Sequence, residues 1–206
     1  GHEVAQLGRR QLGEPVLAAS SFADVVGEGN DLTFQSAGVE IRGAGASFNT
    51  ILGNYIVNNT NGVRLTAGAS RNFIGALNFF QYNQQAVWFE GAHQNTFFRN
   101  SVFDSYGVGV LISAGATSNN LVNNQAVIRN LTGVSVQGAG TVRNRIQGNR
   151  ITLNTGKGIE LAAGGNNGIA PPVAEGFSSQ SVYGTTTAPD GSRVEVFMDF
   201  DDEGNK

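Results

Sequence analysis

The sequence predicts an all-β protein, a right-handed parallel β-helix of about six to seven coils with about 24 residues per coil. Two recurring phrases, one built on Gly and one on Asn, run in phase along the chain, and apolar residues alternate with polar ones inside each copy. The composition agrees. Charged residues are only 14 % and Gly is 29 of 206, which favours short strands joined by tight turns over helices.

The first phrase is Gly-apolar-x-apolar, and it recurs every 23 to 25 residues. Its copies are GVEI at Gly38, GVRL at Gly62, AVWF at Ala86, GVLI at Gly109, GVSV at Gly133 and GIEL at Gly158. A period in the range of roughly 20 to 50 residues is typical of solenoids, and an apolar spacing of two indicates strands. We therefore expect two internal stacks, Val39, Val63, Val87, Val110, Val134, Ile159 and Ile41, Leu65, Phe89, Ile112, Val136, Leu161.

The second phrase is Asn-x-apolar-x-x-Asn. Its copies are NTILGN at Asn49, NTFFRN at Asn95, NNLVNN at Asn119 and NRIQGN at Asn144, and one residue is inserted between Asn72 and Asn78. Stacked amides at a turn can hydrogen-bond from one coil to the next, and Asn tolerates the left-handed conformation that such turns need. We expect a ladder of Asn54, Asn78, Asn100, Asn124 and Asn149.

Together these phrases resemble the right-handed parallel β-helix repeat proteins of the pectin-lyase-like superfamily, over roughly Asn30 to Ile169. The resemblance implies the fold and a secreted or cell-surface location. It implies no single activity, because the superfamily includes lyases, hydrolases, epimerases, adhesins and members of unknown function.

Three regions are predicted. Residues 1–29 form an N-terminal cap and first partial coil, with Val4, Leu7 and Leu12 over that coil; residues 30–170 form the β-helix. Residues 171–206 form a C-terminal tail or the start of a truncated β-sandwich module, because Pro171 and Pro172 cannot donate to a strand ladder. The opening GHE resembles the remnant of an expression tag, so the chain is expected to be part of a larger protein.

Several function classes are disfavoured. The net charge is −3 and no basic run is dense, which argues against nucleic-acid binding. No apolar run is long enough to span a bilayer, and without Cys there is no thiol chemistry. The motifs G-x-S-x-G, H-E-x-x-H and the P-loop are absent, as are the catalytic sets of the superfamily's hydrolases and epimerases. Asp104 is the only Asp between Val39 and Leu161, too few for a lyase calcium site built from aspartates.

The strongest candidate site is an outward patch of Arg42, Arg64, Trp88 and Glu90. An exposed indole flanked by Arg and Glu is typical of a carbohydrate-binding subsite, in which a sugar ring stacks on the aromatic ring. The alternative is a solvated face with ion pairs between neighbouring strands. Glu40 and Glu90, about 10 Å apart by coil spacing, and the single turn residue His93 are further candidates for acid or base chemistry.

Two other features raise questions of assembly and metal binding. Tyr55, Phe79, Phe103, Val57 and Val127 are expected to form an exposed apolar strip that the N-terminal segment or a second copy covers. Near the end of the chain, Asp199, Asp201 and Glu203 precede a Gly at alternate positions, as at the start of a calcium loop. A polar turn is favoured over a calcium site there, and no other cofactor is expected.

The function that the sequence favours is a non-enzymatic β-helical scaffold or carbohydrate-binding segment of a larger secreted or cell-surface protein. The first alternative is a polysaccharide-active enzyme, a lyase, glycoside hydrolase or epimerase, with its site on the Trp88 face. The second is an assembly or adhesion module with a homo-oligomer contact through the apolar strip. Polysaccharide is the partner expected for the favoured function.

Overall fold

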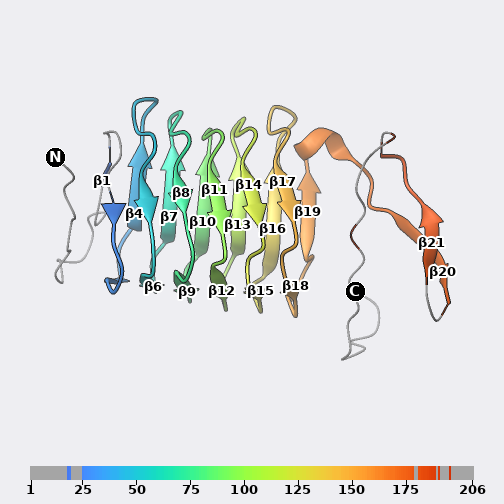
Figure 1. The fold of residues 1–206 in the computed structure, drawn as a ribbon, viewed down its shortest axis with the longest axis horizontal. Coiled ribbons are helices and arrows are strands. Elements are labelled where there is room, and N and C mark those ends of the chain that lie inside the picture. The colour runs from blue at the N-terminus through green and yellow to red at the C-terminus, as the bar shows by residue number, and fades with distance from the viewer. Residues whose placement is uncertain (1–17, 20–24, 179–180, 189, 191–194, 196–206) are drawn as a thin grey trace.

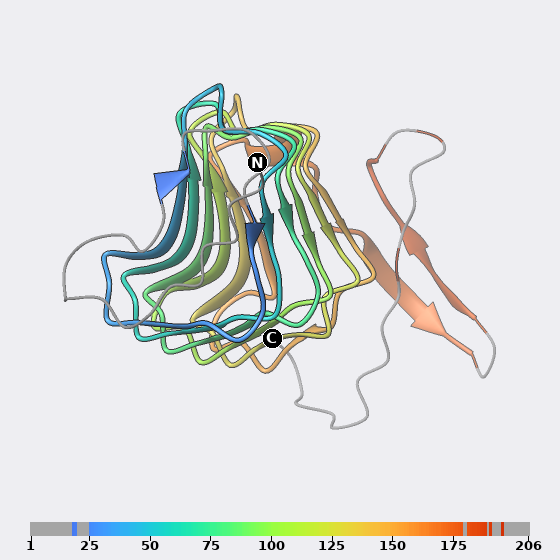
Figure 2. The same ribbon diagram turned by 60° about the vertical axis from the view of Figure 1, so that its left-hand side comes forward.

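The computed structural model describes residues 18–19, 25–178, 181–188, 190 and 195. Over most of this length the chain winds into coils stacked along one axis, and each coil contributes one strand to each of three parallel sheets (Figure 1). Neighbouring strands in every sheet are therefore one coil apart in the sequence, as the repeat predicts. Figure 2, turned towards the axis, shows the three sheets as walls around a common interior.

The strands of the three sheets have the following bounds. Sheet 1 contains β1 (Ala18–Ala19), β4 (Ala37–Arg42), β7 (Asn61–Thr66), β10 (Gln85–Glu90), β13 (Val108–Ser113), β16 (Thr132–Gln137) and β19 (Ile159–Ala162). Sheet 2 contains β2 (Val25–Val26), β5 (Thr50–Ile51), β8 (Phe73–Ile74), β11 (Thr96–Phe98), β14 (Asn120–Val122) and β17 (Arg145–Gln147). Sheet 3 contains β3 (Asp31–Thr33), β6 (Tyr55–Val57), β9 (Phe79–Gln81), β12 (Ser101–Phe103), β15 (Ala126–Ile128) and β18 (Ile151–Thr152).

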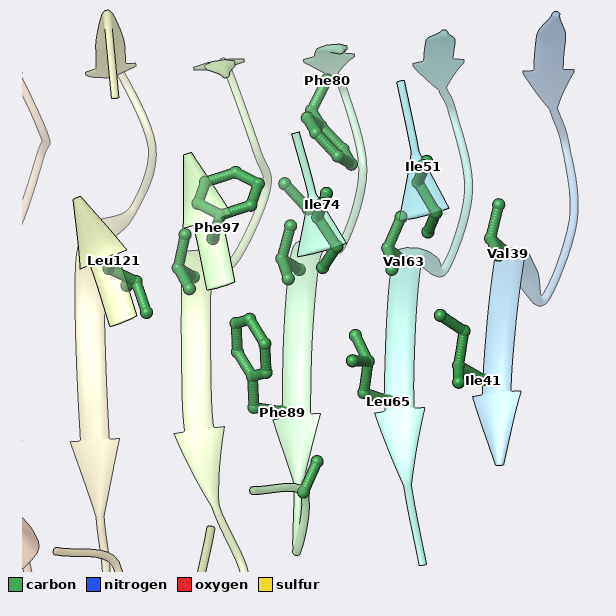
Figure 3. Packing of buried hydrophobic residues seen from close by; sticks show 14 of the residues in the cluster. Val39, Ile41, Ile51, Val63, Leu65, Ile74, Phe80, Phe89, Phe97 and Leu121 are labelled. Atoms are coloured by element: carbon green, nitrogen blue, oxygen red, sulfur yellow. The ribbon is translucent and has the colours of Figure 1, made fainter. Parts of the chain in front are cut away.

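The interior is built from the predicted stacks. The strand register places Val63 beside Val87 and Leu65 beside Phe89, and the same rows continue from β4 to β19. In β19, the last strand of the sheet, Ile159 is 47 % exposed and Leu161 is only partly buried, so the prediction that both are internal holds for their register but not for the burial of Ile159. Each copy of the Gly phrase thus adds one layer to a continuous core (Figure 3). From sheets 2 and 3, Phe97 and Phe80 point into the same core, where their rings lie 5.8 Å apart edge to face.

The predicted Asn ladder is present. Asn54 donates from its backbone N–H and from its side-chain amide to Asn78 Oδ1, at 3.0 and 3.2 Å, and Asn124 donates in the same way to Asn149. Asn78 also bonds to Asn100 through both groups, and Asn100 bonds to Asn124 Oδ1 through its backbone N–H. The ladder therefore joins successive turns between sheets 2 and 3.

Two more ladders occupy the other corners, and the sequence analysis predicted neither. One uses the first Asn of the second phrase: Asn49, Asn72, Asn95, Asn119, Asn144 and Asn166. The other lies between sheets 3 and 1 and includes Gln35, Asn59, Asn83, Asn130 and Asn154, with Ser105 in one coil. The 24-residue spacing of Asn59 with Asn83 and of Asn130 with Asn154 was the available signal.

The turn that leads into sheet 2 bends sharply in every coil. Phe48, Arg71, Gln94, Ser118 and Arg143 occupy equivalent positions there, and all five have positive φ angles between 56° and 58°. A non-Gly residue in this left-handed region is unfavourable on its own, so the stacked hydrogen bonds on either side must impose it. Each of these side chains consequently sits at an outer corner of the solenoid.

Beyond β19 the repeat ends. A short 3-10 helix, η1 (Gly165–Gly168), is followed by the antiparallel pair β20 (Val173–Phe177) and β21 (Val182–Thr185). Nearly all residues of this hairpin are exposed, and both views show it away from the coils (Figures 1 and 2). At the last coil there is a pocket of about 290 Å³, which is lined by Ile146, Gln147, Asn149, Ile151, Gly158, Ile159 and Glu195.

Parts of the predicted terminal regions can be placed. β1 and β2 lie before residue 30 and pair with β4 and β5, so coil-like pairing begins earlier than Asn30. Val4, Leu7 and Leu12, predicted to cap the first coil, lie outside the described residues. No helix in the described part of the chain is long and apolar enough to cross a membrane.

The predicted apolar strip needs a correction. Val127 pairs with Val102 in the inward row of sheet 3 and is 1 % exposed, so its assignment to the outer face was wrong. Val57 shares the outward register of Gln81 but is also buried, at 5 % exposure. The error arose because the inward-outward alternation of β15 was assigned one residue out of step, and such a shift reverses the face of every residue in a strand.

Candidate functional site

The predicted patch lies on the outer face of sheet 1. In the row of β4, β7 and β10, Glu40 is paired with Arg64 and Arg64 with Trp88. The second outward row holds Arg42, Thr66 and Glu90 in the same order. The sequence period therefore brings the predicted residues onto three adjacent strands, as expected.

Arg64 is the centre of the patch. Its guanidinium is ion-paired with Glu90 through Nε (2.9 Å) and Nη2, and with Glu40 through Nη1 (3.6 Å). The same group lies over the Trp88 ring, 4.9 Å from the ring centroid. Thr66 Oγ1 also donates to Glu90 (3.1 Å). One arginine thus holds two carboxylates and covers part of the indole.

Trp88 is held from a second side. Its indole N–H donates to Ser113 Oγ on β13 at 2.9 Å, and the residue as a whole is half-buried. The ring is therefore fixed in one orientation and is less open than the sequence suggested. Arg42, in contrast, is exposed and takes part in none of the ion pairs found among the described residues.

The acid and base candidates have other partners. Glu40 and Glu90 are both paired with Arg64. His93 lies in a turn between Ser70 and Thr117, where its Nδ1 is 3.0 Å from Thr117 Oγ1 and accepts the Thr117 N–H at 3.3 Å. Among the described residues no hydrogen bond or ion pair joins His93 to Glu40 or Glu90, so these three residues do not form one catalytic site.

A second charged pair, which the sequence analysis did not predict, lies at the outer edge of sheet 3. Arg129 donates to both carboxylate oxygens of Asp104, at 2.7 and 3.1 Å, and Gln81 donates to the same carboxylate at 2.9 Å. The hydrogen bond from Arg129 holds the pKa of Asp104 below its usual value; partial burial opposes this, and Gln81 acts in the same direction as Arg129. The spacing of 25 residues, one coil, was the sequence signal.

This pair predicts a pH dependence of stability. Because the pKa of Asp104 is lower in the folded than in the unfolded chain, its stabilising contribution is complete above pH about 4 and is lost as the pH falls through the folded pKa. Asp104→Asn should therefore lower the unfolding midpoint slightly at neutral pH. We expect the gap between the unfolding midpoints of the two proteins to close as the pH falls through the lowered pKa of folded Asp104, measured by thermal unfolding across the acid range. A difference in unfolding midpoint that stayed constant with pH would contradict the stabilising role assigned to the Asp104 carboxylate.

The outward aromatic residues of sheet 3 form a row. Tyr55 and Phe79 stack at 5.2 Å with nearly parallel rings, and Phe103 lies 5.4 Å from Phe79. The guanidinium of Arg129 lies over Phe103, 5.6 Å from the ring centroid. These three aromatic residues lie side by side as the sequence predicted. Tyr55 is 45 % exposed, and Phe79 and Phe103 are partly buried.

The fold and its ladders define the class of protein: a parallel β-helix repeat protein. A family model described as "Periplasmic copper-binding protein (NosD)" matches residues 13–171, more than half of the chain, and the chain belongs to this NosD family. The periplasmic description agrees with the secreted or cell-surface location expected for the protein. Neither the curated proteins nor the solved structures contained a match.

The family description raises the question of copper. Copper prefers His, Cys and Met ligands. The sequence has no Cys, one Met and two His, and only His93 of these lies among the described residues. The Nδ1 of His93 is hydrogen-bonded to Thr117, and the described residues contain no group of three or more His, Cys, Asp or Glu side chains that lie close enough together to hold a metal ion. This part of the chain does not fit a copper site. The calcium candidates Asp199, Asp201 and Glu203 lie outside the described residues.

Proposed function

We propose that the protein is a non-enzymatic β-helical scaffold that binds carbohydrate on the face around Trp88, as a segment of a secreted or cell-surface protein. The observation that carries the proposal is the fixed orientation of the indole between Arg64 and Ser113. A pre-oriented aromatic ring loses little conformational freedom when a ligand contacts it, and this favours binding.

The neighbouring groups supply the polar part of such a site. Glu90 and Arg64 can form charge-assisted hydrogen bonds to sugar hydroxyls, and the exposed Arg42 can reach a hydroxyl or carboxylate from the next strand. Because these side chains come from neighbouring strands of one sheet, their spacing is set by the strand ladder rather than by a mobile loop.

The test is a glycan array probed with the wild-type protein and with Trp88→Ala, followed by analysis of the bound glycans for cleavage. We expect binding by the wild type and a loss of about tenfold in the variant, the size expected for removing one aromatic contact. Tyr106→Ala is the matched control, because Tyr106 is an exposed aromatic residue that stacks on Tyr82 and makes no contact with Trp88.

Three results would redirect the proposal. Equal loss in Trp88→Ala and Tyr106→Ala would exclude a specific site at Trp88. Shortened glycan chains would favour the enzyme alternative on the same face. An absence of glycan binding by the wild type would leave a scaffold without the carbohydrate function.

A further inference from the structure

The solenoid ends at its last coil, where β17, β18 and β19 are each the final strand of a sheet. The inward isoleucines of these strands, Ile146, Ile151 and Ile159, line the pocket at this end, and none of them is fully buried. Their partners one coil earlier are all 1 % exposed. The difference arises because no further coil of the described chain lies over the last one, and apolar surface left open in this way favours a covering segment.

The last coil also presents backbone hydrogen-bond donors. Asn124 donates its backbone N–H to the amide oxygen of Asn149, and Asn130 donates in the same way to Asn154. Asn149 and Asn154 are the last members of these two ladders, and their own backbone N–H groups make no hydrogen bond to a described residue. Because donors of this kind need acceptors, the end of the solenoid suits an occupant that brings oxygen atoms.

One such acceptor is in place at the corner between sheets 2 and 3. In the coil before the last, Asn123 N–H donates to Gln147 O, a carbonyl one coil on, at 3.0 Å. Gly148 follows Asn123 in the same row of corners, and its N–H donates to the carboxylate of Glu195, with Oε2 at 2.8 Å. Glu195 lies 47 residues further along the chain and supplies the acceptor that a further coil would supply.

The last coil and the C-terminal segment carry opposite charges. Residues 141–157 contain four basic residues and no Asp or Glu, and Arg143, Arg145 and Arg150 among them are exposed. Residues 190–206 contain six acidic and two basic residues, a net −4. Opposite charge on two parts of one chain favours their association, and salt weakens it.

The C-terminal segment also carries apolar residues. Residues 194–199 read VEVFMD, with Val194, Val196 and Met198 at alternate positions. This alternation is typical of a strand with one apolar face, which is what the open isoleucines of the last coil need. The structure describes Asp190 and Glu195 of this segment.

We propose that the C-terminal segment, residues 190–206, docks on the end of the solenoid as an acidic cap, with the Glu195 carboxylate in the place of a carbonyl of a further coil. The cap covers the isoleucines of the last coil and blocks edge strands that are open to pairing with a second copy of the chain. This surface lies at the end of the coils and not on the outer face of sheet 1, so the proposal is independent of the one for Trp88.

The test is amide hydrogen exchange in the full chain, with Glu195→Ala as the variant. The Gly148 amide should exchange about tenfold faster in this variant, because its charged acceptor is lost. Glu195→Gln keeps an oxygen acceptor without the charge and should raise the rate by a smaller factor. Glu175→Ala is the matched control, because Glu175 is an exposed Glu on β20 whose carboxylate accepts from Thr185 within the hairpin.

Two further readouts test the docking of the segment and its charge dependence. The amides of residues 194–200 should exchange more slowly in the wild type than in Glu195→Ala. Arg145→Gln/Arg150→Gln, or about 1 M salt, should raise the Gly148 rate several-fold.

Two controls separate these effects from a loss of folding. Arg71→Gln removes an exposed positive charge from an earlier coil and should leave the Gly148 rate unchanged. The Asn123 amide, which is bonded between coils, should exchange at the same rate in every variant.

The proposal is overturned if Glu195→Ala leaves exchange at Gly148 unchanged, or if the amides of residues 194–200 are unprotected in the wild type. Protection of Gly148 that rises with protein concentration, together with a dimer in sedimentation, would also overturn it, in favour of a second copy at this end. A monomer whose protection is independent of concentration and depends on Glu195 is the expected result.

Discussion

Replacing Asn95 with alanine is expected to lower the free energy of unfolding by about 4 kcal/mol, because the change removes four hydrogen bonds worth about 1 kcal/mol each. Asn95 is fully buried. Its amide oxygen accepts the backbone N–H and the side-chain amide of Asn72, both at 2.9 Å, and its amide nitrogen donates to Ala69 O (3.1 Å) and Asn119 Oδ1 (3.0 Å). Truncation leaves the buried Asn72 N–H without that acceptor.

The measurement is the thermal unfolding midpoint, which should fall by roughly 10 °C for a loss of this size in a chain of about 200 residues. Asn120→Ala is the control. Asn120 lies on the outward side of β14, is partly exposed, and makes no side-chain hydrogen bond to any other described residue, so its loss should cost less than about 0.5 kcal/mol. If the two variants unfold at the same temperature, the ladder does not stabilise the solenoid as we argue.

Phe97→Ala should have an effect of similar size, with a loss of about 3–5 kcal/mol for a fully buried ring. Phe97 is 0 % exposed and packs edge to face on Phe80 from the facing sheet. The closed stack cannot collapse around the gap without shifting the coils on both sides, because each coil is held by ladders to its neighbours.

The control for Phe97 is the next residue in the chain. Phe98 points outward from the same strand, is only partly buried, and contacts Arg99 and Phe73 at the surface. We expect Phe98→Ala to cost about 1 kcal/mol or less, measured by denaturant unfolding of both variants side by side. Equal costs for Phe97→Ala and Phe98→Ala would show that the alternation in β11 does not decide which side chain is buried.

Much of the candidate site was predictable because it follows the period. Once Glu40, Arg64 and Trp88 were assigned to equivalent outward positions, their adjacency on neighbouring strands followed from the register. The contacts among these three side chains did not follow from the register. Whether Arg64 would cover the indole, and whether it would hold both carboxylates, depends on rotamers that the spacing leaves open.

The family description and the residues of this chain point in different directions. The NosD family is described as copper-binding, yet the described coils carry the Asn, Thr and apolar residues of a structural stack and only one His.

The sequence by itself determined the architecture, because a period of about 24 residues with an internal spacing of two allows few other ways to bury the apolar positions. It also determined the membership of the two inward stacks and of the Asn54 ladder, since equivalent positions in successive coils must lie above one another. Only the tertiary structure decided the positive-φ corners at Arg71 and Arg143, the two further ladders, the burial of Val127 and the pairing of Arg129 with Asp104. These features depend on where each turn bends and which rotamer each side chain adopts, and both are set by contacts between coils that a linear pattern does not contain.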